Sequence, residues 1–170
     1  MKRLLLLSLL FAFIAPCLMA QNKVVREFIR EHRRGEENIA VTVPGFLIGL
    51  AGEIGMLASD DEEEQLAFSL IQEFGTTKVL TFDTDDFDTS CDVSNLLRTL
   101  EGEFGYERWA TVRAQSGERV ELTVHMKGKA IREIACIVTS PDDHRAVFLH
   151  SRTDFTAEAL GEVLNRLMVE

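Results

Sequence analysis

Four strand-length segments follow one another after Tyr106, with only short connections between them. Each connection carries Gly, or Pro together with Asp, which are the residues that tight turns between strands require. The segments are about as long as strands usually are. They are expected at residues 108–114, 119–126, 131–139 and 146–152. The sequence therefore predicts an antiparallel meander of four strands.

Helical spacing of apolar residues dominates the rest of the chain. The expected helices cover residues 22–34, 46–57, a stretch from the acidic cluster 60–64 through Phe74, residues 93–104, and the end of the chain after Thr156. Thr156 is the expected N-cap of the last helix. Two further strands are expected at 39–43 and 78–82. The predicted fold is α+β: a single domain with a mostly antiparallel sheet, packed by about five helices.

The helix expected over 46–57 is apolar nearly all round, with Glu53 as its one charged residue. Such a helix is expected to be the most buried one in the protein. It is also rich in glycine, which is costly inside a helix. These glycines are Gly45, Gly49, Gly52 and Gly55. Because neither GxGxxG nor GxxxxGK[ST] is present, we interpret them as a close-packing surface rather than a phosphate-binding turn.

Residues 1–20 have the layout of a secretory signal peptide. Lys2 and Arg3 precede an apolar run over 4–15, which is short for a membrane-spanning helix. Ala20 stands at the expected cleavage site. We therefore expect an exported protein, in the periplasm or elsewhere in the cell envelope.

Cleavage after Ala20 leaves a single domain over residues 21–170 without a transmembrane span. Lipid attachment at Cys17 is the less favoured alternative, because Pro16 occupies the place where such signals carry a small residue. The mature chain has 16 basic against 28 acidic residues, a formal charge of −12. This charge repels nucleic acid phosphates and anionic lipids, so DNA and RNA are excluded as partners.

Basic residues cluster on the helix expected over 22–34. They are Lys23, Arg26, Arg30, Arg33 and Arg34. A solvated helix face is the ordinary interpretation of such a set, and a docking surface for a protein partner is the alternative.

The segment after the strand at 78–82 is rich in oxygen ligands, with Asp83, Asp85, Asp86 and Asp88 as candidates for a calcium site. An EF-hand loop starting at Asp83 would need Gly at its sixth position, where Asp88 stands. Turns and helix caps are the favoured interpretation of these aspartates. We therefore expect no cofactor, with Ca²⁺ as the alternative.

No catalytic signature is present in the sequence. The histidines show neither HxxxH nor HExxH spacing, and there is no G-x-S-x-G elbow. Cys91 and Cys136 are 45 residues apart and form no CxxC, so their pairing is left open. We assign no catalytic residue.

Three segments carry a family resemblance: NIAVTVPGFLIGLAGEIG, KVLTFD and ERVELTVHMKGKAIREIACIVTSPDDHRAVFLHSRTDFTAEALGEVLNRL. They resemble the exported bacterial proteins catalogued as domain of unknown function 4252, found chiefly in Bacteroidetes. The resemblance covers about residues 21–169. It implies export and an α+β fold, and it supplies no catalytic residues because the family has no established activity.

The leading hypothesis is a non-enzymatic envelope protein that binds a protein partner. A divalent-cation or small-ligand binding module is the alternative, and a hydrolase of unrecognised type is the second one.

Overall fold

The computed structural model describes residues 23–114 and 117–167. A first helix covers residues 23–32. The elements that follow are β1 (Ile39–Val43), α2 (Gly45–Ala58), α3 (Glu62–Gln72), β2 (Phe74–Asp83), α4 (Thr89–Phe104), β3 (Tyr106–Arg113), β4 (Arg119–Lys127), β5 (Ala130–Ser140), β6 (Arg145–Thr156) and α5 (Ala157–Leu167). The expected signal peptide, residues 1–20, lies outside the described residues.

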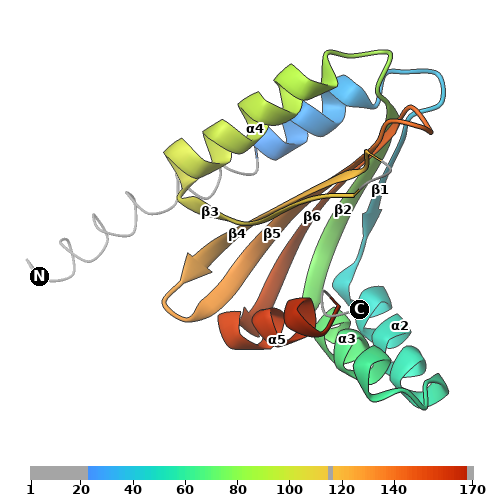
Figure 1. The fold of residues 1–170 in the computed structure, drawn as a ribbon, viewed down its shortest axis with the longest axis vertical. Coiled ribbons are helices and arrows are strands. Elements are labelled where there is room, and N and C mark those ends of the chain that lie inside the picture. Colours follow the sequence, from blue (N-terminus) through green and yellow to red (C-terminus); the bar gives the residue numbers. More distant parts are fainter. Residues whose placement is uncertain (1–22, 115–116, 168–170) are drawn as a thin grey trace, which may run out of the picture.

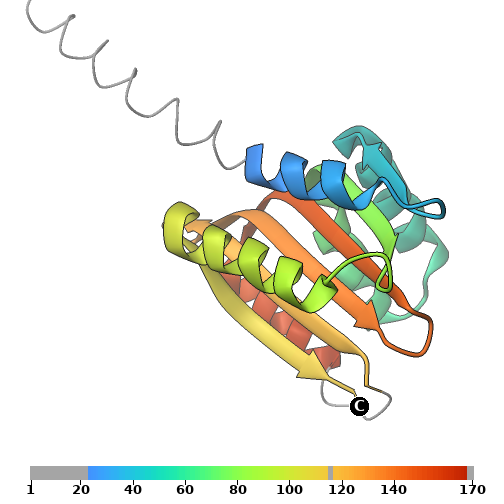
Figure 2. The same cartoon turned by 90° about the horizontal axis from the view of Figure 1, so that it is seen from above.

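The six strands form one antiparallel sheet in the order β1-β2-β6-β5-β4-β3. The first helix and α4 lie on one face, and α5, α3 and α2 lie on the other (Figure 1). Seen from above, the first helix lies between α4 and β1 (Figure 2). The chain is a single α+β domain, and the predicted meander β3-β4-β5-β6 is confirmed.

The central strands bury both faces of the sheet because alternate side chains point to opposite sides. On β5, Ala135 and Ile137 pack against the first helix and α4. Ile134 and Cys136, which alternate with them along the strand, belong to the core beneath α5. The apolar run that sequence analysis assigned to a strand therefore serves two separate cores.

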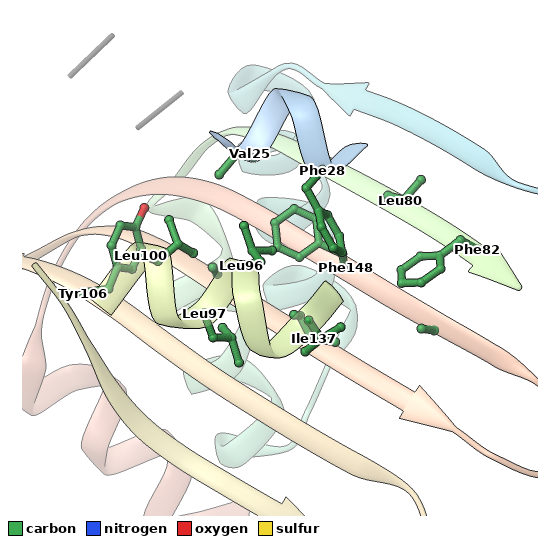
Figure 3. Packing of buried hydrophobic residues seen from close by; sticks show 13 residues of the cluster. Val25, Phe28, Leu80, Phe82, Leu96, Leu97, Leu100, Tyr106, Ile137 and Phe148 are labelled. Atoms are coloured by element: carbon green, nitrogen blue, oxygen red, sulfur yellow. The ribbon is translucent and has the colours of Figure 1, made fainter. Parts of the chain in front are cut away.

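The core under α4 holds most of the large buried side chains (Figure 3). Phe28 meets the rings of Phe82 and Phe148 edge to face, with centroids 6.0 and 5.1 Å apart. Burying each such side chain contributes about 1.5–3 kcal/mol. These contacts fix the first helix on the sheet and thereby set its distance from β1.

His32 joins the first helix to α4. Its side chain is buried, with Nδ1 2.9 Å from the carbonyl oxygen of Phe28 and Nε2 3.2 Å from Oδ2 of Asp92. Its ring also packs against Phe87, with centroids 4.6 Å apart. This histidine is therefore a structural contact between two helices.

The caps of α4 match its sequence signals. Asp88 accepts a hydrogen bond from the backbone N–H of Cys91, and Gly105 ends the helix with φ of 68°. At the other end of the chain, the predicted cap is also confirmed, since Thr156 Oγ1 accepts from the N–H of Ala159 at 3.2 Å.

Three elements differ by about four residues from the sequence-based prediction, one of them being β6, which runs to Thr156 instead of ending at residue 152. Phe74 begins β2 instead of ending the third helix, because it pairs with Thr153 and its ring packs on Phe155 at 5.7 Å. Tertiary packing has overridden local helical spacing here. The third difference is at α4, which begins at Thr89, four residues earlier than the first apolar residue of its stripe.

The expectation that the helix at 46–57 is the most buried one is wrong. Gly52 is the only buried residue of α2. The large apolar side chains of this helix are instead exposed: Phe46, Leu47, Leu50, Ile54 and Leu57. Sequence hydrophobicity predicted the wrong environment because α2 packs through its glycines and leaves its bulky side chains outside.

The glycine side of α2 lies directly against α3 and β2. A Cβ built at Gly52 would lie 3.0 Å from the main-chain oxygen of Phe68, and one at Gly45 would lie 2.9 Å from the main chain of Gly75. Real Cβ atoms seldom approach so closely. The close-packing interpretation of the glycines is therefore confirmed at these positions.

Two glycine-to-alanine changes in helix interiors test this packing. Alanine normally stabilises a helix interior by about 0.5–1 kcal/mol relative to glycine. Gly102→Ala in α4 should show that gain, because its Cβ would meet nothing within 4 Å. Gly52→Ala should instead lower the free energy of unfolding by about 1–2 kcal/mol through overpacking. Urea denaturation measures both, and equal effects at the two positions would contradict the packing described.

Candidate binding surfaces

The exposed side of α2 is a continuous apolar stripe. Phe46, Leu50, Ile54 and Leu57 follow the i, i+4 and i+3 spacing that places side chains on one helix face. Phe46 is 74% exposed and Leu57 85%. No charged residue interrupts this face, since Glu53 lies at its margin by helical geometry. We refer to these residues together with Leu47 as the α2 stripe.

A second exposed apolar surface crosses the sheet on the face shared with α2. Cross-strand pairing aligns one residue from each of the six strands in a row. The row consists of Ile39, Thr81, Val147, Val138, Val120 and Val112. Its two ends are the most open, at 60% for Ile39 and 45% for Val112. The helices on this face therefore cover the sheet only in part.

A basic groove of about 320 Å³ separates the first helix from β1. Arg26, Arg30 and Arg33 line one wall, because their i, i+4 and i+7 spacing puts them on one side of the helix. Ala40, Val41 and Thr42 of β1 form the opposite wall, although by strand alternation only Ala40 and Thr42 turn their side chains to this face. Lys78 of β2 lies in the groove. We call this set the basic groove.

Positive charges are crowded around Lys78. Partial burial, followed by the charges of Arg26 and Arg152, lowers the pKa of its ammonium group, and Glu133 opposes this only in part. Within the described part of the chain, Arg30 and Arg33 form no ion pair. The groove therefore carries positive charge that an anionic ligand would neutralise.

The structure brings together three of the five basic residues singled out in the sequence. Lys23 does not line the groove; it shares a neighbouring hollow with Arg26 and Arg30, and its Nζ lies 3.8 Å from Oε1 of Glu27 on the same helix. Arg34 follows the helix in a turn and is exposed. Only Arg26, Arg30 and Arg33 line the basic groove.

A third site is a cavity of about 250 Å³ beside the start of α4. Glu121 of β4 is buried there and pairs with Arg119 of the same strand. Nε of Arg119 is buried without a hydrogen-bond partner in the described part of the chain. Hydroxyl groups of Thr84, Ser94 and other residues complete the lining. This cavity is large enough for a small molecule, and its polar groups stand in a mainly apolar lining.

Three titratable side chains meet in the interior between β3, β5 and β6. Tyr106 Oη and His150 Nε2 each lie 3.0 Å from Oε2 of Glu133, and 3.2 Å from each other. Burial alone would raise the pKa of Glu133, but the hydrogen bond and charge of His150, then Tyr106 and Arg152, outweigh it and lower this pKa. All three residues are at most 4% exposed, so a dissolved substrate cannot reach them.

The aspartates of the calcium candidate act in turns and caps. Asp83 Oδ1 accepts from the N–H of Asp85 at 2.8 Å, and Asp88 caps α4. Asp85 also lies 3.2 Å from Nδ1 of His144, while Asp86 is exposed in the same loop. In the described residues, no three His, Cys, Asp or Glu side chains are grouped so that they could hold a metal ion. The calcium site stays a prediction.

The two cysteines of the described chain are both free. Cys91 is exposed on α4. Cys136 is half-buried on β5 in the core beneath α5, and burial raises the pKa of its thiol. Since they lie on opposite faces of the sheet, they do not pair.

Sequence reasoning missed the open edge at β1, the buried Glu121 and the Tyr106–Glu133–His150 cluster. The alternation of Ile39 and Val41 identified the strand, but nothing local shows which strand ends a sheet. The carboxylates at 121 and 133 stand at inward positions of apolar strands, and this break in the apolar pattern was the available signal.

One comparison identifies the family of the chain. The domain of unknown function DUF4252 matches residues 32–163. The chain belongs to this family. The match spans every strand and helix from β1 to β6 and so includes the whole α2 stripe, whereas Arg26 and Arg30 of the basic groove precede it. No curated protein and no solved structure matches the chain.

The lowered pKa of Glu133 predicts acid sensitivity. In the unfolded chain the carboxylate of Glu133 takes up a proton at its ordinary pKa near 4.5, whereas in the folded protein its pKa is lower. The stability that this carboxylate contributes is therefore complete above about pH 4.5 and is lost as the pH falls through the pKa of the folded state. Glu133→Gln should therefore flatten the fall in melting temperature below about pH 4.5. Glu103→Gln, an exposed change on α4, is the control and should leave the curve as it is. Parallel curves for wild type and Glu133→Gln would contradict this role.

Proposed function

We propose that this protein is an exported, non-enzymatic interaction module of the cell envelope that docks a protein partner through the α2 stripe. The observation that carries this proposal is the exposure of five large apolar side chains on one side of a helix whose other side is held by glycine contacts. Soluble monomers rarely leave such a contiguous apolar surface open unless it binds something.

The energetics favour docking at this stripe. Each Leu or Ile that is half exposed would gain about 1 kcal/mol when a partner covers it. Because glycine contacts fix α2 against α3 and β2, the stripe is already ordered before binding, and a partner meets a preformed surface. The helix-in-groove mode of recognition uses anchors at this spacing.

Charge favours a protein over a lipid surface as the partner. The acidic segment 60–64 follows α2 directly, and a phosphate-rich membrane surface would repel it. None of the helices in the described residues is both long and apolar enough to cross a bilayer. Phe46 and Leu57 at the two ends of the stripe would instead fit an apolar groove in another protein.

The Tyr106–Glu133–His150 cluster supports the non-enzymatic part of the proposal, because its polar atoms are closed to solvent and serve one another. The cavity beside Arg119 and Glu121 fits the alternative of small-ligand binding. That alternative, the calcium site and the hydrolase stay predictions.

Photo-crosslinking from the α2 stripe tests the proposal. Benzoylphenylalanine in place of Ile54 should give one discrete adduct with another protein when cells are irradiated, because this side chain is exposed at the centre of the stripe. The matched control is the same residue at Gly102, which is exposed on α4 and has open space around it. It should give no such adduct.

Three outcomes separate the possibilities. An adduct of twice the chain mass would mean that the partner is a second copy, which still makes the protein an interaction module. Adducts with lipid alone would replace the protein partner with a membrane. Equal yields from positions 54 and 102 would contradict docking at the stripe.

A further inference from the structure

The open edge of β1 offers a second recognition feature, distinct from the α2 stripe. β1 ends the sheet, so its outward backbone groups have no strand beside them within the described chain. Natural edge strands are usually protected from pairing by Lys, Pro, inward charges or a bulge. The five residues of β1, IAVTV, include neither Lys, Pro nor a charged residue, and they pair with β2 in unbroken register.

The two faces of this edge differ in chemistry. Ile39 and Val41 lie on the α2 side and are exposed apolar residues. Ala40 and Thr42 point to the other side, where small side chains leave the basic groove open. A strand added beside β1 would therefore meet apolar residues on one face and arginines on the other, in strict alternation.

We propose that β1 and the basic groove bind an extended segment of a partner protein in which acidic and apolar residues alternate. The segment adds an antiparallel or parallel strand to the sheet edge. Its carboxylates enter the groove beside Arg30 and Arg33, while its apolar side chains cover Ile39 and Val41. This inference deepens the proposed protein-binding function and rests on it.

The charge around Lys78 supports an acidic occupant. Burial and the neighbouring cations lower the pKa of this lysine, so a carboxylate in the groove would relieve a repulsion that already exists. The acidic turn between the first helix and β1 does not fully supply the negative charge that would neutralise the groove. One of its carboxylates, that of Glu37, is paired with Arg145 of β6, with Oε2 2.7 Å from Nη2.

Charge also argues against a second copy pairing edge to edge. Two β1 strands joined antiparallel around a two-fold axis would continue the same faces of both sheets. The two basic grooves would then lie about two strand spacings, or roughly 10 Å, apart, which is close to the Debye length of about 8 Å at physiological salt, so their repulsion would be only partly screened. Six arginines and two lysines would repel one another there. An acidic strand removes that repulsion.

Fluorescence anisotropy with labelled peptides tests the inference on the purified protein. The probe is a peptide of about nine residues in which Glu and Val alternate, long enough to pass β1 on both sides. A control peptide has the same composition with all Glu residues before all Val residues. The alternating peptide should bind at least about tenfold more tightly, since only it can match both faces. Raising the salt concentration should weaken its binding.

Charge and backbone contacts can be tested separately. Arg30→Glu with Arg33→Glu should weaken the alternating peptide by about tenfold or more. Arg98→Glu, a change at an exposed arginine on α4, should leave binding nearly unchanged. In an added strand, every second residue of the peptide donates its backbone N–H to β1. N-methylation of these residues should abolish binding, while N-methylation of the residues between them should have little effect.

Each remaining outcome overturns the inference. Three results would show that the groove is only a non-specific anion surface. They are equal affinity for the two peptides, an equal loss of affinity in Arg98→Glu, and no loss of affinity on N-methylation of either set of alternate residues. Tight binding of inorganic polyphosphate or of vesicles containing phosphatidylglycerol that exceeds the alternating peptide would replace the strand with a phosphate ligand. Failure here leaves the α2 crosslink untouched, and failure of the crosslink leaves peptide binding measurable, so the two claims are distinguishable.

Discussion

The whole architecture depends on covering a single antiparallel sheet whose central strands carry apolar side chains on both faces. The first helix and α4 meet this need on one face, where Phe28, Leu97 and Phe148 close the core. On the other face α5 covers the strands near Leu122 and Ile134, and α3 contributes Leu70. That second cover is incomplete, and it leaves the row from Ile39 to Val112 and the edge of β1 open.

The helix α2, which follows β1 in the chain, exposes its large apolar side chains instead of burying them. A helix as apolar as α2 would ordinarily bury its large side chains, yet its backbone approaches Phe68 and Gly75 so closely that only glycine fits at the contact. The bulky residues are left on the far side. The apolar helix, the open strand edge and all of the basic groove except Lys78 thus come from one short stretch of chain, residues 26–57. The proposed binding activity depends on these neighbouring features.

Much of this fold could be predicted from sequence because its signals are local. The turns of the meander, the strand at 39–43 and the caps at Gly105 and Thr156 each depend on a few neighbouring residues. The environment of α2 could not be predicted this way, since hydrophobicity says how apolar a helix is and not which side it packs. The prediction that Phe74 ends a helix was wrong for a similar reason, because its packing partner Phe155 is far away in the chain.

The candidate sites follow the same division. The arginines at i, i+4 and i+7 were visible as a helical face, but the strand opposite them was not. The net charge of the chain is negative, and a net charge does not show that basic residues come together locally in a groove. The buried Glu133 illustrates the converse: its position in an apolar strand indicates burial, but only the fold shows that His150 and Tyr106 hydrogen-bond to it.

The central claim is that the α2 stripe is open in the isolated protein and covered in the cell. The most direct test is maleimide labelling of Leu50→Cys in a Cys91→Ser background, compared with Gly102→Cys. The account predicts that both cysteines react rapidly in the purified protein, whereas in intact cells position 50 becomes at least about tenfold slower than position 102. Equal rates at the two positions in cells, or a blocked position 50 in the purified protein, would contradict it.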